Sequence, residues 1–467
     1  MKIEQIYTGC LSQGAYYIES NGEVAIIDPL REVDNYIGKA KEDGAKIKFI
    51  LETHFHADFV SGHVSLAKKT GATIIYGPNA NPLFDVKIAE DNEVFKLGDI
   101  TITAMHTPGH TMESTTYLLK DEHGKDYAIF TGDTLFLGDV GRPDLAQKAA
   151  DMTQEDLAGI LFDSLRTKIM PLADDITVYP AHGAGSACGK NMMKETLDTL
   201  GNQKKVNYAL RADMTKEEFI KEVTDGLAPP PKYFPLNVKM NKEGYEDLDD
   251  VMKRVASKGL SPDAFEVAAN ETNAIVLDVR NQIEFVKGHI PRSIFIGIDG
   301  GFAPWVGALI ADVKQPILLV VPEGRLDEVL IRLSRVGFDN TIGFLKGGIE
   351  AWRIAGKELD NIESVTAQQF ETDFKQHGTF DVRKAGEFDS SHVDSAHLTT
   401  LDSLNEHLAE FPKNGKFFIH CAGGYRSVIA SSILKSRGIH NMINVEGGMT
   451  AIQNTGVKVK TSSCSNA

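Results

Sequence analysis

Cysteine is scarce in this sequence. Its 467 residues include four, which are too few and too scattered for a disulfide framework. They are Cys10, Cys188, Cys421 and Cys464. Isolated thiols of this kind fit a reducing cytoplasm. No apolar run approaches the roughly 20 residues of a membrane helix, and the first residues contain no apolar signal segment. We therefore expect a cytoplasmic protein that binds no membrane.

Basic residues form no cluster, and the formal net charge is −16 at pH 7. Nucleic acids and anionic membranes attract proteins through clustered Lys and Arg, so we expect neither as a partner. The chain is too long for a single core, and its 42% apolar content suits several globular domains. The oligomeric state stays open, with a homo-oligomer as one alternative.

A dense group of metal-binding residue types follows an apolar run at residues 47–51, which we interpret as a buried strand. His54, His56 and Asp58 occupy alternate positions directly after this run. Ligands of α/β sheets bind at the carboxyl ends of the strands, and a loop there can direct several donors at one ion. The alternative is that these histidines are ordinary solvated loop residues. Three donors in five positions disfavour that alternative.

Further donors follow other expected strands. They are His110 after residues 100–105, Asp133 after residues 127–130, and His182 after residues 176–179. These motifs, in this order, resemble those of the metallo-β-lactamase superfamily over roughly residues 1–235. The resemblance implies an α/β fold in which two sheets form an αβ/βα sandwich with a metal site at one edge.

One position departs from the dinuclear zinc hydrolases of that superfamily, which include glyoxalase II. Their first motif reads His-x-His-x-Asp-His, and its last histidine helps to hold a second metal. Here that position is Phe59, which cannot ligate. A second site would then keep only Asp58, His182 and a shared Asp133.

The sequence is similar instead to the persulfide dioxygenases, a branch that binds one iron through two histidines and one carboxylate. This resemblance implies one Fe(II) per chain, a set of three ligands, and a second shell of residues that orient those ligands. The implied ligands are His54, His110 and Asp133, and the implied second shell is His56, Asp58 and His182. Such a ligand set leaves open positions on the metal for substrate and O₂.

Two further residues are candidates for roles near this site. Arg142 lies in a glycine-rich stretch after Asp133, and its guanidinium suits a substrate carboxylate or phosphate, although a plain surface turn is the alternative. Cys188 follows His182 closely. We interpret it first as a packed thiol, and second as a sulfur carrier.

The rest of the chain contains a duplication. The pattern Asp-Val-Arg, then Glu-Phe, begins at Asp278 and again at Asp381, a spacing of one whole domain. Both copies resemble the rhodanese family, another α/β fold. We expect a metallo-β-lactamase-like domain at residues 1–235, a linker at 236–261, and rhodanese domains at 262–360 and 364–460.

The second copy carries a candidate nucleophile. Cys421 begins Cys-Ala-Gly-Gly-Tyr-Arg-Ser between an expected strand and an expected helix. Backbone N–H groups of such a loop and the helix N-terminus stabilise a thiolate or a bound persulfide, and Arg426 completes the motif. In the first copy, alignment on Gly337 and Gly438 places Val320 opposite Cys421. We therefore expect the first copy to be catalytically silent.

These observations favour a persulfide dioxygenase fused to a sulfurtransferase of sulfide metabolism. Its reactants would be a low-molecular-weight thiol persulfide, O₂, and sulfite or thiosulfate, with sulfane sulfur carried by Cys421. One alternative is a zinc thioester hydrolase of the glyoxalase II kind with an accessory rhodanese module. Another is a sulfur carrier or redox sensor without enzymatic activity. Phe59 disfavours the hydrolase.

Overall fold

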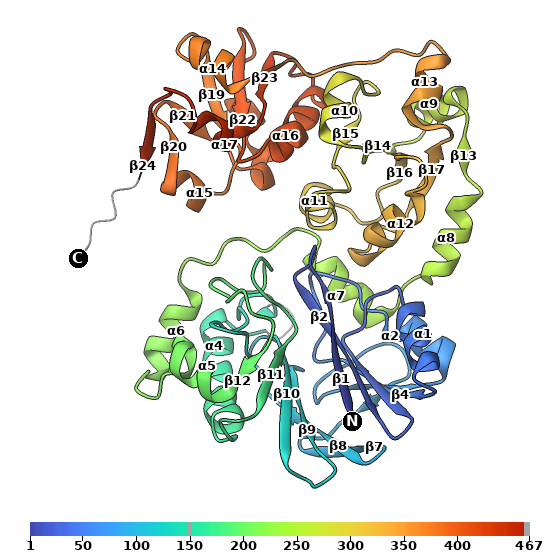
Figure 1. Cartoon of the computed structure of the whole chain (residues 1–467), viewed down its shortest axis with the longest axis vertical. Helices are drawn as coiled ribbons and strands as arrows, with labels where there is room; N and C mark the ends of the chain where they lie inside the picture. Colours follow the sequence, from blue (N-terminus) through green and yellow to red (C-terminus); the bar gives the residue numbers. More distant parts are fainter. Residues whose placement is uncertain (148–150, 462–467) are drawn as a thin grey trace. The chain divides into compact units, whose positions relative to one another are not determined.

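The computed structural model describes residues 1–147 and 151–461. Cys464 lies outside the described residues. The chain divides into two compact units. The first is Met1–Asp249 with Leu333–Gly337, and the second is Asp250–Arg332 with Phe338–Ala467 (Figure 1). No helix in the described part of the chain is long and apolar enough to cross a membrane.

The first unit contains two six-stranded sheets. One has the order β1-β2-β3-β4-β5-β6, with β1 Lys2–Thr8, β2 Gln13–Ser20, β3 Glu23–Ile27, β4 Lys46–Leu51, β5 Thr73–Tyr76 and β6 Lys87–Ile88. The other has the order β12-β11-β10-β9-β8-β7, with β7 Glu93–Leu97, β8 Ile100–His106, β9 Thr115–Lys120, β10 Asp126–Gly132, β11 Thr177–Pro180 and β12 Asp198–Thr199. A tight hairpin turn joins β2 and β3, where Asn21 and Gly22 both have positive φ.

Helices cover the outer faces of these sheets. They are α1 Asp34–Glu42, α2 His63–Thr70, α4 Gln154–Ser164, η1 Leu165–Ile169, α5 Leu200–Val206, η2 Tyr208–Leu210, α6 Lys216–Thr224 and α7 Phe234–Glu243. The helix α8 Leu248–Ala256 crosses the division between the units. Gly71 ends α2 in a left-handed conformation.

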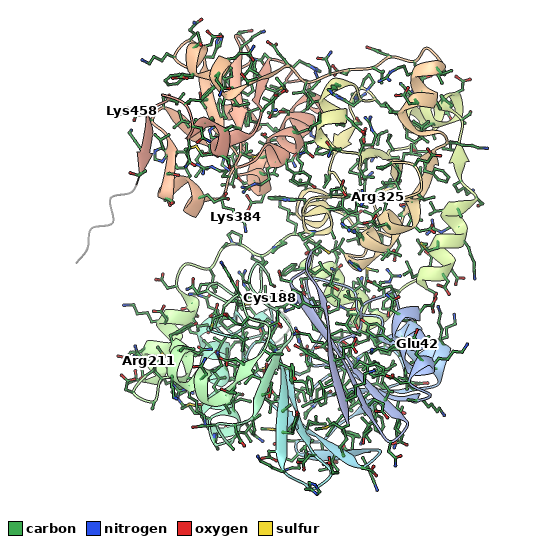
Figure 2. The ribbon with its side chains drawn as sticks, in the orientation of Figure 1. Glu42, Cys188, Arg211, Arg325, Lys384 and Lys458 are labelled. Carbon is green, nitrogen blue, oxygen red and sulfur yellow. The ribbon has the colours of Figure 1, made fainter. Side chains whose placement is uncertain are left out.

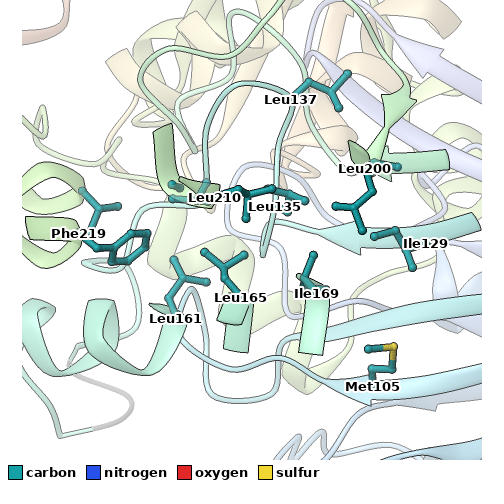
Figure 3. Close-up of a cluster of buried hydrophobic side chains, with 14 of the residues drawn as sticks. Met105, Ile129, Leu135, Leu137, Leu161, Leu165, Ile169, Leu200, Leu210 and Phe219 are labelled. Carbon is teal, nitrogen blue, oxygen red and sulfur yellow. The ribbon is translucent and has the colours of Figure 1, made fainter. Parts of the chain in front are cut away.

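Three apolar layers hold the first unit together. Between the sheets, residues such as Leu51 of β4 and Phe130 of β10 share one buried cluster. A second cluster joins α1 and α2 to the outer face of the first sheet. A third joins α4 and α6 to the second sheet, with Leu161, Phe219 and Ile129 in one buried cluster (Figure 3). This arrangement confirms the predicted αβ/βα sandwich.

The second unit contains two five-stranded parallel sheets. The first has the order β13-β17-β16-β14-β15, with β13 Gly259–Leu260, β14 Ile275–Asp278, β15 Ile294–Phe295, β16 Ile317–Val320 and β17 Thr341–Leu345. The second has the order β18-β23-β22-β19-β21, with β18 Ser364–Val365, β19 Gly378–Asp381, β21 Ala396–Leu398, β22 Phe417–His420 and β23 Met442–Val445. A short antiparallel pair, β20 Ser391–Val393 and β24 Val459–Thr461, accompanies the second sheet.

The helices of the second unit repeat in the same way as its sheets. Around the first sheet lie α9 Pro262–Glu271, α10 Gln282–Lys287, α11 Phe302–Leu309, α12 Leu326–Arg335 and α13 Gly348–Ile354. Around the second lie α14 Ala367–Asp373, α15 Ala385–Ser390, η3 Leu401–Glu406, η4 Leu408–Glu410, α16 Tyr425–Ser436 and α17 Gly448–Ile452. Each sheet has its own apolar cluster, so each copy has a separate core.

Candidate metal centre and sulfur-transfer loop

Three loops of the first unit bring His54, His110 and Asp133 together. They follow β4 of one sheet and β8 and β10 of the other. All three side chains are buried. The Oδ2 atom of Asp133 lies 3.8 Å from Nε2 of His54 and 3.5 Å from Nε2 of His110. Because metal bonds to such donors are about 2 Å long, one ion can contact all three atoms.

The side-chain atoms that these three residues direct at one another are suited to bind a metal ion. Asp133 Oδ2 is buried and has no hydrogen-bond partner among the described residues, as expected for a carboxylate oxygen that ligates. His110 donates from Nδ1 to the backbone oxygen of Arg142 at 2.8 Å, which leaves the lone pair on Nε2. Burial holds the pKa of His54 well below its ordinary value, so this ring is also neutral.

A short hydrogen-bond chain orients His54. The Thr53 hydroxyl donates to Asp28 Oδ2 at 2.8 Å, so its oxygen can accept from His54 Nδ1 at 2.9 Å. Asp28 Oδ1 also accepts the Thr53 backbone N–H at 2.8 Å. Since Nδ1 carries the proton in this arrangement, His54 Nε2 is free to bind an ion.

The residues expected around the ligands lie beside them. His182 joins Asp133 Oδ1 through Nδ1 and Asp58 Oδ2 through Nε2, both at 2.8 Å. Burial disfavours the charged ring, but the two carboxylates outweigh this effect and raise the pKa of His182. The His56 ring lies 4.2 Å from that of His54, measured between centroids. These contacts place all three residues where they can orient ligands.

Phe59, which stands at the position of the last histidine in the zinc-hydrolase motif, lies beside two histidines of the site. Its side chain is fully buried, and its ring centroid lies 4.3 Å from that of His56 and 6.4 Å from that of His182. Asp58, His182 and Cys188 nevertheless have donor atoms within 4.8 Å of one another. The sequence did not predict that Cys188 lies next to Asp58.

The loop that carries the first motif is fixed by a residue far along the chain. Asn241 of α7 donates from Nδ2 to the backbone oxygens of His56 and Phe59, both at 2.8 Å. Its Oδ1 accepts the Ser61 N–H at 2.8 Å. Asn241 lies in the range that the sequence predicts as a linker, and no local motif marks it. The predicted domain boundaries remain predictions.

The second unit presents Cys421 in a loop between β22 and α16. The cysteine is buried, and its Sγ accepts the N–H of Gly424 at 3.1 Å. Arg426 binds both carboxylate oxygens of Glu387, at 2.6 and 2.7 Å. A sulfur atom at a helix N-terminus with a backbone donor is suited to negative charge.

Known families match both regions. The sequence-family model described as the metallo-beta-lactamase superfamily matches residues 8–182. The family model of the rhodanese-like domain matches residues 261–355 and 366–455. A cytoplasmic hydroxyacylglutathione hydrolase from Arabidopsis thaliana is 35% identical over 187 residues, which are 39% of this chain and 67% of the plant protein. The chain belongs to the metallo-β-lactamase superfamily. It also carries two rhodanese-like domains.

Other relatives differ in their named reactions. The mitochondrial persulfide dioxygenase ETHE1 of Mus musculus is 27% identical over 221 residues, which are 47% of this chain and 78% of the mouse protein. The crystal structure of a metallo-beta-lactamase from Staphylococcus aureus superposes with a TM-score of 0.65 at 30% identity, and the match covers 74% of this chain and 98% of the other. Hydrolases and a dioxygenase are thus similarly close to this member of the superfamily.

Arg142 is less available to a substrate than its sequence context suggests. It is buried, and Asp144 accepts from its Nε and Nη2 at 2.6 and 2.7 Å. Two backbone carbonyls, of Ala187 and Ala228, accept further bonds. Substrate binding by Arg142 stays a prediction, and it requires exchange of Asp144 for the substrate. Its visible contribution is the carbonyl that accepts from His110.

Cys188 is buried in the first unit, where Figure 2 labels it. Burial and the nearby carboxylates of Asp58 and Asp133 raise the pKa of its thiol well above the usual value. Because the thiolate is the nucleophile in sulfur transfer, this environment disfavours the predicted carrier role, which stays untested.

The first rhodanese-like domain lacks a cysteine, but the predicted counterpart of Cys421 is one residue out of place. β16 places Val320 opposite Asp278, as β22 places His420 opposite Asp381. Since the nucleophile directly follows His420, its counterpart is Val321 and the prediction of Val320 is wrong. The conclusion that this copy has no nucleophile is unchanged.

The error arose from the length of one segment. From the nucleophile position to the glycine that follows the helix, the first copy is one residue shorter than the second. Gly324 and Gly424 both have positive φ just before α12 and α16, so the loops correspond up to that point. Arg325 then corresponds to Tyr425, although counting back from Gly337 and Gly438 would pair it with Arg426. Asp299 and Glu328 each bind Arg325 at 2.7 Å.

The chain through Thr53 gives a first testable prediction. In Thr53→Val the hydroxyl that accepts from His54 is lost, so the affinity of the site for metal should fall about 10- to 100-fold. Thr53→Ser keeps the hydroxyl and should restore most of this affinity. Metal content after dialysis against graded chelator measures the effect. Equal affinities in the valine variant and the wild type would contradict the role of Thr53.

Proposed function

We propose that the protein is a persulfide dioxygenase and sulfurtransferase of sulfide metabolism. The observation that carries this proposal is Phe59, a fully buried apolar ring where a second-metal histidine would stand, beside a complete set of two histidines and one carboxylate. This set is typical of mononuclear iron(II) oxygenases. The similarity to a mouse persulfide dioxygenase supports the same reaction.

The overall chemistry requires one persulfide, one O₂ and one water, which give a thiol, sulfite and two protons. His54, His110 and Asp133 would hold Fe(II), which supplies adjacent binding positions for O₂ and the persulfide sulfur. Thr53 and the Arg142 carbonyl fix the ring orientations of the two histidines. His182 holds Asp133 by its other oxygen, so that Oδ2 keeps facing the histidines.

Cys421 would carry sulfane sulfur. Its thiolate attacks the outer sulfur of a persulfide, the S–S bond breaks, and the thiol leaves with the proton. Sulfite then attacks the outer sulfur of the Cys421 persulfide, which releases thiosulfate and restores the thiolate. The Gly424 N–H faces Sγ and stabilises the negative charge at each stage.

A direct test combines metal analysis with two activity assays. Protein loaded with iron(II) should consume O₂ in proportion to added glutathione persulfide or coenzyme A persulfide. It should not cleave a glutathione thioester at a comparable rate. Purified protein that holds two zinc ions per chain and cleaves thioesters would refute the proposal.

The zinc thioester hydrolase remains the second candidate, because two observations favour it. Asp58, His182 and Cys188 form a second group of donors next to the first. The Arabidopsis relative named as a hydrolase shares 35% identity with the chain. The rhodanese-like domains do not distinguish the candidates, since either enzyme could carry them.

Restoring the missing histidine separates the two candidates. In Phe59→His, the new imidazole lies beside Asp58 and His182, so the variant should gain a second metal ion relative to the wild type. Phe55→His is the matched control, because Phe55 lies in the same motif but packs on Tyr76, with ring centroids 4.7 Å apart. Two metal ions per chain already present in the wild type would favour the hydrolase.

A further inference from the structure

The loop that carries Cys421 is held from outside its own domain. Tyr425, the first residue of α16, donates its hydroxyl hydrogen to the backbone oxygen of Gly297 at 2.6 Å. Its ring meets that of Phe295 edge to face, with centroids 5.7 Å apart. Gly297 and Phe295 belong to the first rhodanese-like domain, and both domains lie in the second unit.

The Tyr425 ring packs so closely on Gly300 that no side chain fits there. A Cβ atom added to Gly300 would lie 2.3 Å from Cζ of Tyr425, closer than real contacts allow. The neighbouring Gly301 has no such conflict, since its Cβ would first meet Trp305 at 3.3 Å. Burial raises the pKa of Tyr425, so its hydroxyl remains a donor at physiological pH.

Tyr425 is covalently next to the residue that contacts the sulfur. Gly424, with φ +99°, directs its N–H to Sγ of Cys421 at 3.1 Å. The other side of the loop is fixed within its own domain, because Met449 donates its N–H to the Cys421 oxygen at 2.7 Å. The loop is therefore held from both domains, and one of these contacts comes from the first rhodanese-like domain.

We propose that the cysteine-free domain positions the sulfur-transfer loop. The Gly297 oxygen binds the Tyr425 hydroxyl, and Gly300 leaves room for the Tyr425 ring. Through these contacts Tyr425, a positioning residue, aligns the Gly424 N–H with the Cys421 sulfur. The inference rests on the proposed role of Cys421 as sulfur carrier. It gives the silent copy a specific task in the reaction, beyond connecting the parts of the chain.

The test adds a methyl group at Gly300, in the first rhodanese-like domain, which has no nucleophile of its own. Gly300→Ala should lower the rate of Cys421 alkylation by iodoacetamide, and kcat for sulfur transfer from thiosulfate to cyanide, by about 10- to 100-fold. The KM for thiosulfate should change little, because the variant leaves every residue of the Cys421 loop unchanged. Gly301→Ala is the matched control and should behave as the wild type. Mass spectrometry of the Cys421 peptide separates its alkylation from that of the other cysteines.

A double-mutant cycle distinguishes positioning from general damage. If the methyl group acts through the Tyr425 ring, Gly300→Ala should have no further effect in a Tyr425→Ala background. Tyr425→Phe keeps the ring and should lose less than Tyr425→Ala. Ser432→Ala removes another bond between the two domains, from the Phe295 N–H at 3.0 Å, and should leave alkylation unchanged.

Two outcomes would overturn the inference. One is an unchanged alkylation rate in folded Gly300→Ala. The other is additive losses in the double variant, which would show that the methyl group acts by another route. If wild-type protein transfers no sulfur, the proposed function fails, while the alkylation series still tests whether the silent domain controls Cys421.

Discussion

Replacing Asp133 with alanine is expected to strip the metal from the first unit and to abolish O₂ uptake with a persulfide substrate. The change removes the oxygen that faces His54 and His110, and also the oxygen that binds His182. Since loss of a single supporting residue already costs about 10- to 100-fold in metal affinity, loss of a charged ligand should cost more. Metal content and O₂ consumption measured on the same sample check this result.

Asp139 provides the control for this experiment. It is as buried as Asp133, with 1% of each residue's surface exposed, and lies in the same segment. Its oxygens accept the N–H groups of Val140, Lys190 and Asn191, and it is not part of the donor group. Asp139→Ala should lower stability without specific loss of metal. Sulfur transfer at Cys421 should survive in both variants, and iron retained by Asp133→Ala would contradict the proposed ligand set.

The sequence predicted this group of candidate metal donors because each follows a local pattern. An apolar run forms a strand, and polar residues of the loop that follows lie at the edge of the sheet where ligands bind. His54, His110 and Asp133 all obey this pattern, and the structure brings their donor atoms within 4.8 Å. The patterns show where each strand ends. They do not show which carbonyl or hydroxyl will hold each ring.

The contacts that escaped prediction all depend on tertiary packing. Asn241 reaches the metal motif from about 180 residues away, and Tyr425 reaches Gly297 across more than 120. Neither residue belongs to a motif, since an isolated Asn or Tyr is common anywhere in a chain. The assignment of Val320 failed for a related reason. A helix can lose one residue without changing the sheet register, so counting from a terminal glycine misplaces the loop.

The two chemistries belong to different units of the chain, which constrains how sulfur passes between them. The loop of Cys421 is held by Tyr425 and Met449, so the cysteine has little freedom to travel. A small thiol that carries the persulfide can diffuse between sites, and their union in one chain raises its local concentration. We therefore propose that a low-molecular-weight thiol, not the Cys421 loop, delivers sulfur to the metal.

Cys421→Ser is expected to abolish sulfur transfer while leaving oxidation of a pre-formed persulfide near the wild-type rate. A serine hydroxyl does not ionise near neutral pH and cannot form a persulfide, so transfer should fall by about three orders of magnitude or more. With one persulfide and O₂ supplied, the wild type should produce thiosulfate and the variant should accumulate sulfite. Chromatography of the sulfur products after equal O₂ uptake measures this change.

Cys10→Ser is the control for that product switch. Cys10 is partly exposed and belongs to none of the three buried donor groups among the described residues, so its loss should leave thiosulfate as the product. Residual transfer in Cys421→Ser would mean that another cysteine carries sulfur. Loss of O₂ uptake together with thiosulfate would mean that Cys421 takes part in the oxidation itself. If the two reactions are separable and a diffusing thiol joins them, the variant must accumulate sulfite while its O₂ uptake is undiminished.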